Sequence, residues 1–253
     1  ALDSPAFARD AVEAYWLALL RDVPFARYGD DPLVARAVAD LRKAGSEVTP
    51  ATLFARGARA GAARATSGPS ISQFLLRPVP MGAQVLSARV TAQAPGEAFL
   101  ATWDDWLASQ NGQLPRHDVT WVGRRYICCG RDLATWTRTD YPGQAGLQAA
   151  LILEAWRAPV SEGHPYVRSR NQAGYVTFGL PFIVDLASRV AMHALRAAWF
   201  QKWVVHRRLR PEEFGGRLEA AAAGAPVAAW PDARFMQSDA LAEMRRRTGT
   251  CLL

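Results

Sequence analysis

The sequence predicts an all-α protein, a helical bundle with at most one short β-hairpin. Two observations support this prediction. Apolar residues recur at helical spacing in roughly seven or eight separate stretches, and only one segment, residues 84–92, alternates weakly as a strand does. Short connections between such stretches are typical of a bundle. We therefore expect residues 1–253 to form one helical unit.

Caps and prolines mark the first two helices. Asp3-Ser4-Pro5 offers a capping side chain with a proline in the first turn, and Val23-Pro24 ends the helix. Asp31-Pro32 begins a second helix, which runs to Lys43 and closes at Gly45. The first helix carries an apolar stripe at i, i+3 and i+4, formed by Val12, Tyr15, Trp16, Leu19 and Leu20.

The segment that follows is less regular. Thr49-Pro50 begins a third element, and the Gly/Ala/Arg-rich residues 57–68 predict a mobile surface loop. Residues 69–76 are compatible with either a helix or an extended segment. Residues 84–92 are interpreted as one arm of the hairpin, and residues 99–109 predict a helix that ends before Gly112.

Three further helices are predicted in the second half of the chain. Residues 131–139 and 145–156 form two of them, and the second is apolar enough for the centre of a bundle. Residues 164–173 form a loop. Residues 181–208 form the longest helix, with a predicted inward face of Phe182, Leu186, Val190, Ala194, Ala197 and Val204.

Composition narrows the function classes. Half of the residues are hydrophobic and nine are Trp, which is ample for a core. The formal net charge is +7, but the basic residues are scattered and no zinc-finger, RNA-recognition or basic-zipper pattern accompanies them, so we expect no nucleic-acid partner. No apolar stretch reaches the roughly 18 residues of a membrane span without a charge or a proline. We expect a soluble protein; no signal peptide is visible, and the compartment stays open.

The cysteines and histidines predict neither a disulfide framework nor a metal site. Cys128 and Cys129 are adjacent, which would strain a mutual disulfide, and the third cysteine, Cys251, lies near the end. The four histidines are scattered along the chain. Packing is the expected role of the cysteines.

The segment from Lys202 to Pro211 holds the candidate site. Lys202 and Arg210 lie about two helical turns apart, and an ammonium and a guanidinium in one pocket neutralise an oxyanion. The alternative is a solvated basic face at a helix end, where the helix dipole favours cations. Arg207 and Arg208 are interpreted as surface residues, and residues 212–216 as the stop of this segment.

Several separate stretches resemble the vanadium-dependent haloperoxidase family, in its bromoperoxidase-like branch, which is related to the type 2 phosphatidic acid phosphatases. Residues 182–216 carry what resembles the family's first oxyanion-binding motif, through Gln201-Lys202-Trp203, Val205-His206-Arg207, Arg210-Pro211-Glu212 and Gly215-Gly216. The other matching stretches are residues 15–25, 72–76, 103–107, 126–127, 130–134 and 175–179.

The resemblance implies a vanadate cofactor, whose place phosphate or sulfate can take, with hydrogen peroxide and halide as substrates. Lys202 and Arg210 would bind the vanadate. The family completes its site with a Ser-Gly-His segment, a second Arg and a His that binds vanadium, and none of these follows Gly216. We therefore expect a central portion of a longer fold that needs a complementing C-terminal polypeptide or a homo-oligomer.

The sequence leaves several alternatives open. The chain could be a non-catalytic scaffold of degenerate haloperoxidase fold or a phosphatase-like relative. Trp199 and His206 are secondary pocket candidates, each balanced by an ordinary packing or hydrogen-bonding role. Lys202 and Arg210 are eight residues apart. On an ideal α-helix this spacing places their side chains about 80° apart around the axis, unless the residue before Pro211 leaves the α region. The apolar end at Cys251 is either a buried terminus or surface that the missing portion covers.

Overall fold

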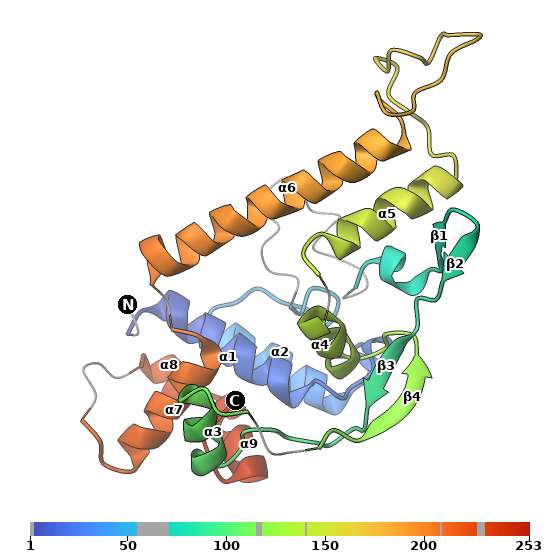
Figure 1. The fold of residues 1–253 in the computed structure, drawn as a ribbon. Helices are drawn as coiled ribbons and strands as arrows, with labels where there is room; N and C mark the ends of the chain where they lie inside the picture. Colours follow the sequence, from blue (N-terminus) through green and yellow to red (C-terminus); the bar gives the residue numbers. More distant parts are fainter. Residues whose placement is uncertain (1–2, 55–70, 115–117, 140, 208, 227–230) are drawn as a thin grey trace.

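The computed structural model describes residues 3–54, 71–114, 118–139, 141–207, 209–226 and 231–253 (Figure 1). Most of its elements are helices, and the strands are short. The α-helices are α1 Pro5–Leu19, α2 Pro32–Lys43, α3 Trp103–Gln110, α4 Gly130–Thr139, α5 Gln144–Ala155, α6 Leu180–Phe200, α7 Pro211–Ala222, α8 Ala233–Met236 and α9 Asp239–Thr248. The remaining elements are η1 Phe25–Arg27, η2 Gln73–Leu76, η3 Gln201–His206, β1 Val79–Met81, β2 Gln84–Leu86, β3 Val90–Gln93 and β4 Trp121–Arg125.

The core forms where α1 and α2 meet the C-terminal helices α7, α8 and α9. The side chain of Ser4 caps α1 by accepting from the Phe7 N–H, and Asp31 caps α2. Both helices were predicted, the second with its observed bounds. The apolar stripe of α1 is buried, and Tyr15 and Trp16 are fully enclosed. Figure 1 shows the blue and red helices side by side, so segments from the two ends of the chain make one core.

A buried carboxylate fixes the contact between α1, α2 and α9. Asp40 on α2 is 3 % exposed. One of its oxygens accepts hydrogen bonds from the Trp16 indole at 2.8 Å and from the Ala240 N–H at 2.9 Å. The other accepts from the Asp239 N–H at 3.1 Å. Asp40 therefore satisfies a side chain of α1 and the first amides of α9 together.

The chain end contributes to the same core. Cys251 and Leu252 are almost fully buried, and the carbonyl of Cys251 accepts a hydrogen bond from the Tyr15 hydroxyl. Burial is the main reason why the pKa of Tyr15 lies well above its usual value. Cys251 and Leu252 are therefore part of the core and do not form an exposed apolar surface.

The predicted stop at residues 212–216 is wrong, because α7 starts there. Pro211 occupies the first turn of α7, where a missing N–H costs nothing. The two glycines permit close packing rather than ending the helix. A Cβ on Gly216 would overlap the indole ring of Trp106 on α3, and Trp106 donates a hydrogen bond to the Glu212 carbonyl at 2.9 Å.

The described residues form two antiparallel two-stranded sheets, of which one is the single expected hairpin and the other pairs two distant strands. Strands β1 and β2 form the expected hairpin, with Val79 opposite Leu86. Strand β3 pairs with the distant β4, which the sequence analysis missed. Strand β4 is mostly exposed and contains a glycine, so it lacks the alternation that marks a half-buried strand. Helix α4 packs beside β3.

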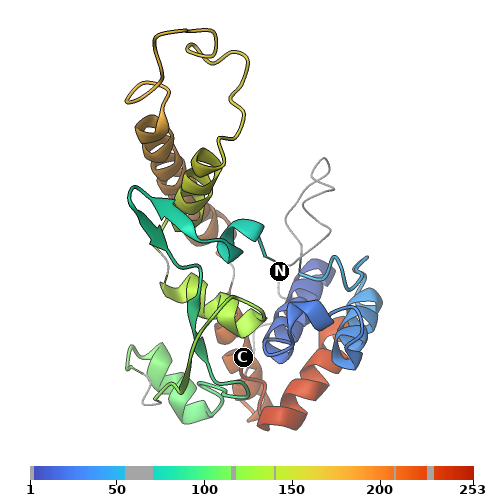
Figure 2. The ribbon, with the colours of Figure 1, turned by 90° about the vertical axis from the view of Figure 1, so that its right-hand side faces the viewer.

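Helices α5 and α6 form a hairpin that stands apart from the core. In both views α5 lies beside α6, and Figure 1 shows the last turns of α6 coming down beside the start of α1 (Figures 1 and 2). The predicted inward face of the long helix is wrong, because no residue of α6 is buried and α5 buries only Ile152. The exposed large apolar residues of α6 are Phe182, Ile183, Leu186, Val190, Met192, Trp199 and Phe200.

The other helix predictions agree with the structure apart from their ends. Helix α3 begins at Trp103, four residues later than predicted, and residues 164–173 form a loop. Residues 73–76 adopt a short 3-10 helix. The predicted mobile loop at residues 57–68 lies outside the described residues. Among the described helices, none combines the length and hydropathy needed to cross a membrane.

We predict that Asp40→Ala lowers the free energy of unfolding by about 3 kcal/mol or more, because each buried donor left without its acceptor costs about 1–3 kcal/mol. Urea unfolding followed by circular dichroism measures the change. Asp30→Asn is the control, since Asp30 pairs with Arg27 on the surface and such exposed pairs contribute little to stability. Equal effects of the two changes would show that Asp40 does not join the helices.

We predict opposite effects of Gly→Ala at two helical glycines. Gly216→Ala should destabilise by about 1–3 kcal/mol, because the added methyl group displaces Trp106. Gly146→Ala on α5 meets no atom within 4 Å and should be neutral or stabilise by up to about 1 kcal/mol, through helix propensity. Thermal unfolding of the two variants tests this pair, and a stable Gly216→Ala protein would refute the close contact between α3 and α7.

Candidate oxyanion-binding site

The segment that carries Lys202 changes its conformation twice between α6 and α7. Helix α6 ends at Phe200, and Gln201–His206 continues as one π-helical turn. Arg207 then adopts a left-handed conformation with φ 45°, which is uncommon for a residue other than glycine. Its N–H closes the turn by donating to the Lys202 carbonyl at 3.1 Å. The predicted single helix through residue 208 is therefore wrong at its end.

Arg210 leaves the helical region, as the proline that follows it predicts. Its φ of −70° and ψ of 152° are those of an extended residue at the N-cap of α7. The ideal-helix rotation of the pair does not apply, because Lys202 belongs to a π-turn and Arg210 to an extended N-cap. The backbone between them, not a shared helical face, determines how the two head groups are placed.

Lys202 and His206 line one pocket, of about 840 Å³, between the start of α1 and η3. Arg207 lines it too, although the sequence analysis treated this residue as surface, and Arg208 lies outside the described residues. Arg217 of α7 and Asp10 of α1 complete its charged lining. The pocket therefore carries three cationic side chains and one carboxylate, a balance that favours an anion.

Arg210 is not among the residues that line this pocket. Its guanidinium forms an ion pair with the Glu212 carboxylate, and the side chain is 58 % exposed. Lys202 places its ammonium 4.5 Å from the centre of the Trp203 ring, a cation–π contact. In this structure the two predicted oxyanion ligands therefore have separate partners.

Of the two Trp side chains near the site, Trp203 contacts Lys202, but it is exposed and, like Trp199, does not line the pocket. Trp199 on α6 is 53 % exposed and does not line the pocket of Lys202. Sequence reasoning missed Trp203 because adjacent residues do not face each other on an α-helix. It missed Asp10 and Arg217 because they are distant in sequence, and no local pattern could have linked them to Lys202.

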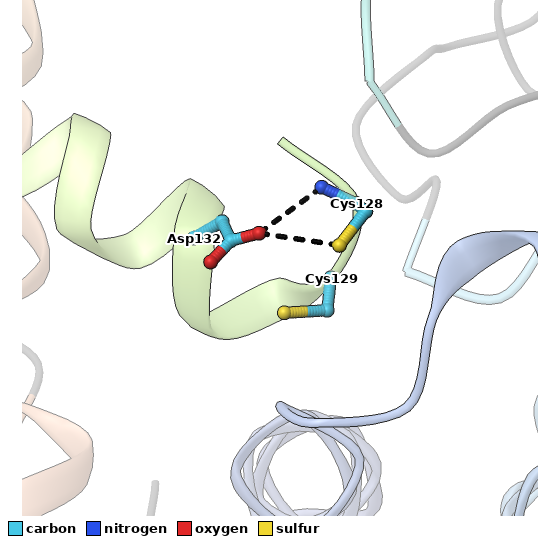
Figure 3. Close-up of side chains that lie close together, drawn as sticks. All are labelled: Cys128, Cys129 and Asp132. Atoms are coloured by element: carbon cyan, nitrogen blue, oxygen red, sulfur yellow. Dashed lines mark hydrogen bonds between the residues drawn. The ribbon is translucent and has the colours of Figure 1, made fainter. Parts of the chain in front are cut away.

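A cluster around Cys128, Cys129 and Asp132 was also missed by the sequence analysis (Figure 3). One ligand atom from each residue lies within 4.8 Å of the others. Asp132 is fully buried, and its carboxylate accepts from the Arg125 guanidinium at 2.9 and 3.0 Å and from the Cys128 N–H at 3.2 Å. Burial, then the hydrogen bond to Asp132, raises the pKa of the Cys128 thiol to about 11.

These contacts indicate a structural role for the cluster. A metal ion prefers deprotonated thiols, whereas the Cys128 thiol stays protonated and the Asp132 oxygens already have donors. Arg125 also adds a positive charge beside the sulfur atoms, with its Nη2 3.9 Å from the Cys129 Sγ. Asp132 therefore holds the start of α4 against β4 through Arg125; of the two cysteines, Cys129 is buried and Cys128 is exposed.

The side chains of the candidate site fit an oxyanion by charge but not yet by position. Lys202 and Arg210 are the residue types that bind vanadate-like or phosphate-like groups. For both to touch one anion, Arg210 has to release Glu212, and Lys202 has to turn from Trp203. We therefore derive no chemical step on a bound vanadate from this arrangement.

Comparison with known proteins identifies relatives over most of the chain. A vanadium-dependent bromoperoxidase of Ascophyllum nodosum is 34% identical over 240 residues, which are 88% of this chain and 42% of the relative. A vanadium-dependent bromoperoxidase of Corallina officinalis is 29% identical over 270 residues, 86% of this chain and 44% of the relative. The chain thus spans less than half the length of these curated relatives. No family model matches the sequence.

The fold agrees with these relatives. The homohexameric structure of the second vanadate-dependent bromoperoxidase from Ascophyllum nodosum superposes with a TM-score of 0.83 at 29% sequence identity. The match covers 98% of this chain and 43% of that chain. By sequence and by fold, this chain is related to the vanadium-dependent bromoperoxidases over the part of them that it spans.

Proposed function

We propose that this chain is part of a vanadate-dependent haloperoxidase, which oxidises halide with hydrogen peroxide. Lys202 and Arg210 would supply two of the cations around the vanadate, and the Ser-Gly-His segment, the second Arg and the vanadium-binding His would lie outside the 253 residues. The observation that carries the proposal is the pocket that Lys202 and Arg207 line with positive charge, in the segment that resembles the family's first oxyanion motif.

The roles of the two cations differ. The ammonium of Lys202 acts as a compact point charge, whereas the planar guanidinium of Arg210 can bind two oxygens of one anion. Glu212 neutralises Arg210 in the absence of an anion, and on binding Arg210 would exchange Glu212 for the oxyanion. This exchange keeps the guanidinium paired in both states.

The ion pair of Arg210 with Glu212 also favours a second candidate, a non-catalytic relative. An internal carboxylate that permanently balances Arg210 would leave the fold without an oxyanion site. The two candidates differ in one measurable property, because only the first requires both Lys202 and Arg210 to bind vanadate.

We further propose that α5 and α6 are covered by a complementing polypeptide or by another copy of this chain. The exposed side chains of α6 include Leu186 at 47 % and Val190 at 58 % exposure. An apolar surface of this kind marks an interaction site. The structurally similar bromoperoxidase from Ascophyllum nodosum is a homohexamer, which supports association as a property of this fold.

We predict that Lys202→Gln and Arg210→Lys each weaken vanadate binding in the assembled protein. Losing a charged hydrogen bond costs about 1.5–3 kcal/mol, or roughly tenfold or more in the dissociation constant. Arg210→Lys keeps the charge but loses the two-oxygen contact. Isothermal titration calorimetry measures the affinities, with Arg124→Gln as the control, because Arg124 is an exposed arginine of β4.

Two results would contradict this assignment. If Arg124→Gln weakened vanadate binding as much as Lys202→Gln, the effect of Lys202→Gln would be one of net charge. If the 253-residue chain alone brominated a phenol dye with vanadate and peroxide, its site would be complete without the residues that we place outside it.

We predict that the isolated chain self-associates through α6. Leu186→Glu and Val190→Glu should shift the protein toward the monomer in light scattering, because each places a charge on the apolar surface. The melting temperature should change little, since neither side chain is buried. Thr137→Glu, an exposed change on α4, is the control. A wild-type chain that is monomeric at all concentrations would argue against an interaction surface here.

A further inference from the structure

A second cationic pocket, of about 230 Å³, lies where the end of α1, the end of β3 and α4 meet. Figure 1 shows α4 beside β3, away from the junction of α6 and α7. The pocket shares no lining residue with the pocket of Lys202. Its polar lining consists of Arg21, Gln93, Glu97, Arg131, Thr135 and Arg138.

Two of the arginines are held side by side. Arg131 is 4 % exposed and donates from Nε and Nη2 to the Asp22 carboxylate. Its Nη2 also donates to the Glu97 carbonyl at 2.8 Å, and the Arg21 Nη2 donates to the same carbonyl oxygen at 3.0 Å. Two guanidinium groups therefore converge on one acceptor, and their positions are fixed before any ligand arrives.

This arrangement leaves positive charge without a counter-ion. The pKa of Arg21 lies below its usual value, first because the side chain is buried and second because Arg131 repels its charge. Asp22 and Glu97 supply two carboxylates against the three guanidinium groups of Arg21, Arg131 and Arg138. One positive charge is uncompensated, which an anion in the pocket would balance.

Helix α4 adds a third arginine on the correct face. Arg131, Thr135 and Arg138 are spaced i, i+4 and i+7, so they lie on one side of α4. The Thr135 hydroxyl donates to the Arg131 carbonyl at 2.9 Å and is not available to a ligand. Arg138 is exposed and has no ion pair or hydrogen bond with the residues that the structure describes, so its guanidinium is available.

Gln93 adds a neutral polar group to the pocket. It lines the pocket at 6 % exposure, and no hydrogen bond joins its side-chain amide to the described part of the chain. The buried polar atom of the lining that lacks a partner within the described residues is Oε2 of Glu97, which would repel an anion. A ligand oxygen in the pocket would accept from the Gln93 amide and from the arginines together.

We propose that this pocket binds a small oxyanion of the phosphate class, held by Arg21, Arg131 and Arg138 with the amide of Gln93. Guanidinium groups bind such oxyanions through two parallel hydrogen bonds. The volume admits a compact anion and not a large ligand. This site is separate from the Lys202 pocket and does not depend on the proposed function.

The test uses inorganic phosphate and the chain that carries Lys202→Gln and Arg210→Gln, so that the other site does not contribute. Calorimetry at low salt should show saturable binding of one phosphate. Arg138→Gln should weaken it about three- to tenfold and Arg21→Gln about tenfold or more, the effect of a lost charged hydrogen bond. Glu97→Gln should strengthen it, because a repelling carboxylate is removed.

Arg124→Gln is the matched control and should leave phosphate affinity unchanged, since it removes the same charge from exposed β4. Arg138 is exposed, so Arg138→Gln should fold even if Arg21→Gln does not. The gain with Glu97→Gln separates direct binding from a general loss of structure. Absence of saturable binding, or equal losses with Arg138→Gln and Arg124→Gln, would overturn the proposal.

Discussion

The buried carboxylate of Asp40 is the constraint on which the rest of the structure depends. It accepts hydrogen bonds from the Trp16 indole and from the first amides of α9, in a core where no water can take the place of the carboxylate. The C-terminal segment is thereby fixed to α1, and the core formed there includes Phe214 and Leu218 of α7. Because α7 is anchored in this way, the position of Arg210 at its N-cap follows from contacts far away in the sequence.

The candidate site lies at the border between an anchored and an exposed part of the molecule. Arg210 belongs to the anchored side, whereas Lys202 follows α6, none of whose residues is buried. The π-turn of η3 and the left-handed Arg207 connect the two sides. The relative position of the two cations therefore depends on the contacts that fix α6. In this structure the guanidinium of Arg210 is paired with Glu212.

Local chemistry made much of the fold predictable, and non-local contacts explain the failures. Ser4-Pro5 and Asp31-Pro32 carry their capping signals in adjacent residues, so α1 and α2 could be predicted. Gly216 was mistaken for a stop because its reason, the Trp106 ring, lies 110 positions earlier in the sequence. Strand β4 was missed because its partner β3 is distant. At the site, the types and positions of Lys202 and Arg210 could be inferred, but their present partners Trp203 and Glu212 could not.

The exposure of α6 and the incomplete convergence of the cations have a common physical basis. A guanidinium in contact with water interacts weakly with an anion, because two unit charges 4 Å apart attract by about 1 kcal/mol in bulk water and by about 4 kcal/mol at the effective dielectric of a protein surface. Arg210 is 58 % exposed, and Lys202 is exposed as well. Covering the apolar side chains of α6 would exclude water from the neighbouring η3 and strengthen the attraction of both cations for an oxyanion. On this argument, the apolar surface of α6 that we propose as an interaction site is also the one whose burial would strengthen anion binding by Lys202 and Arg210.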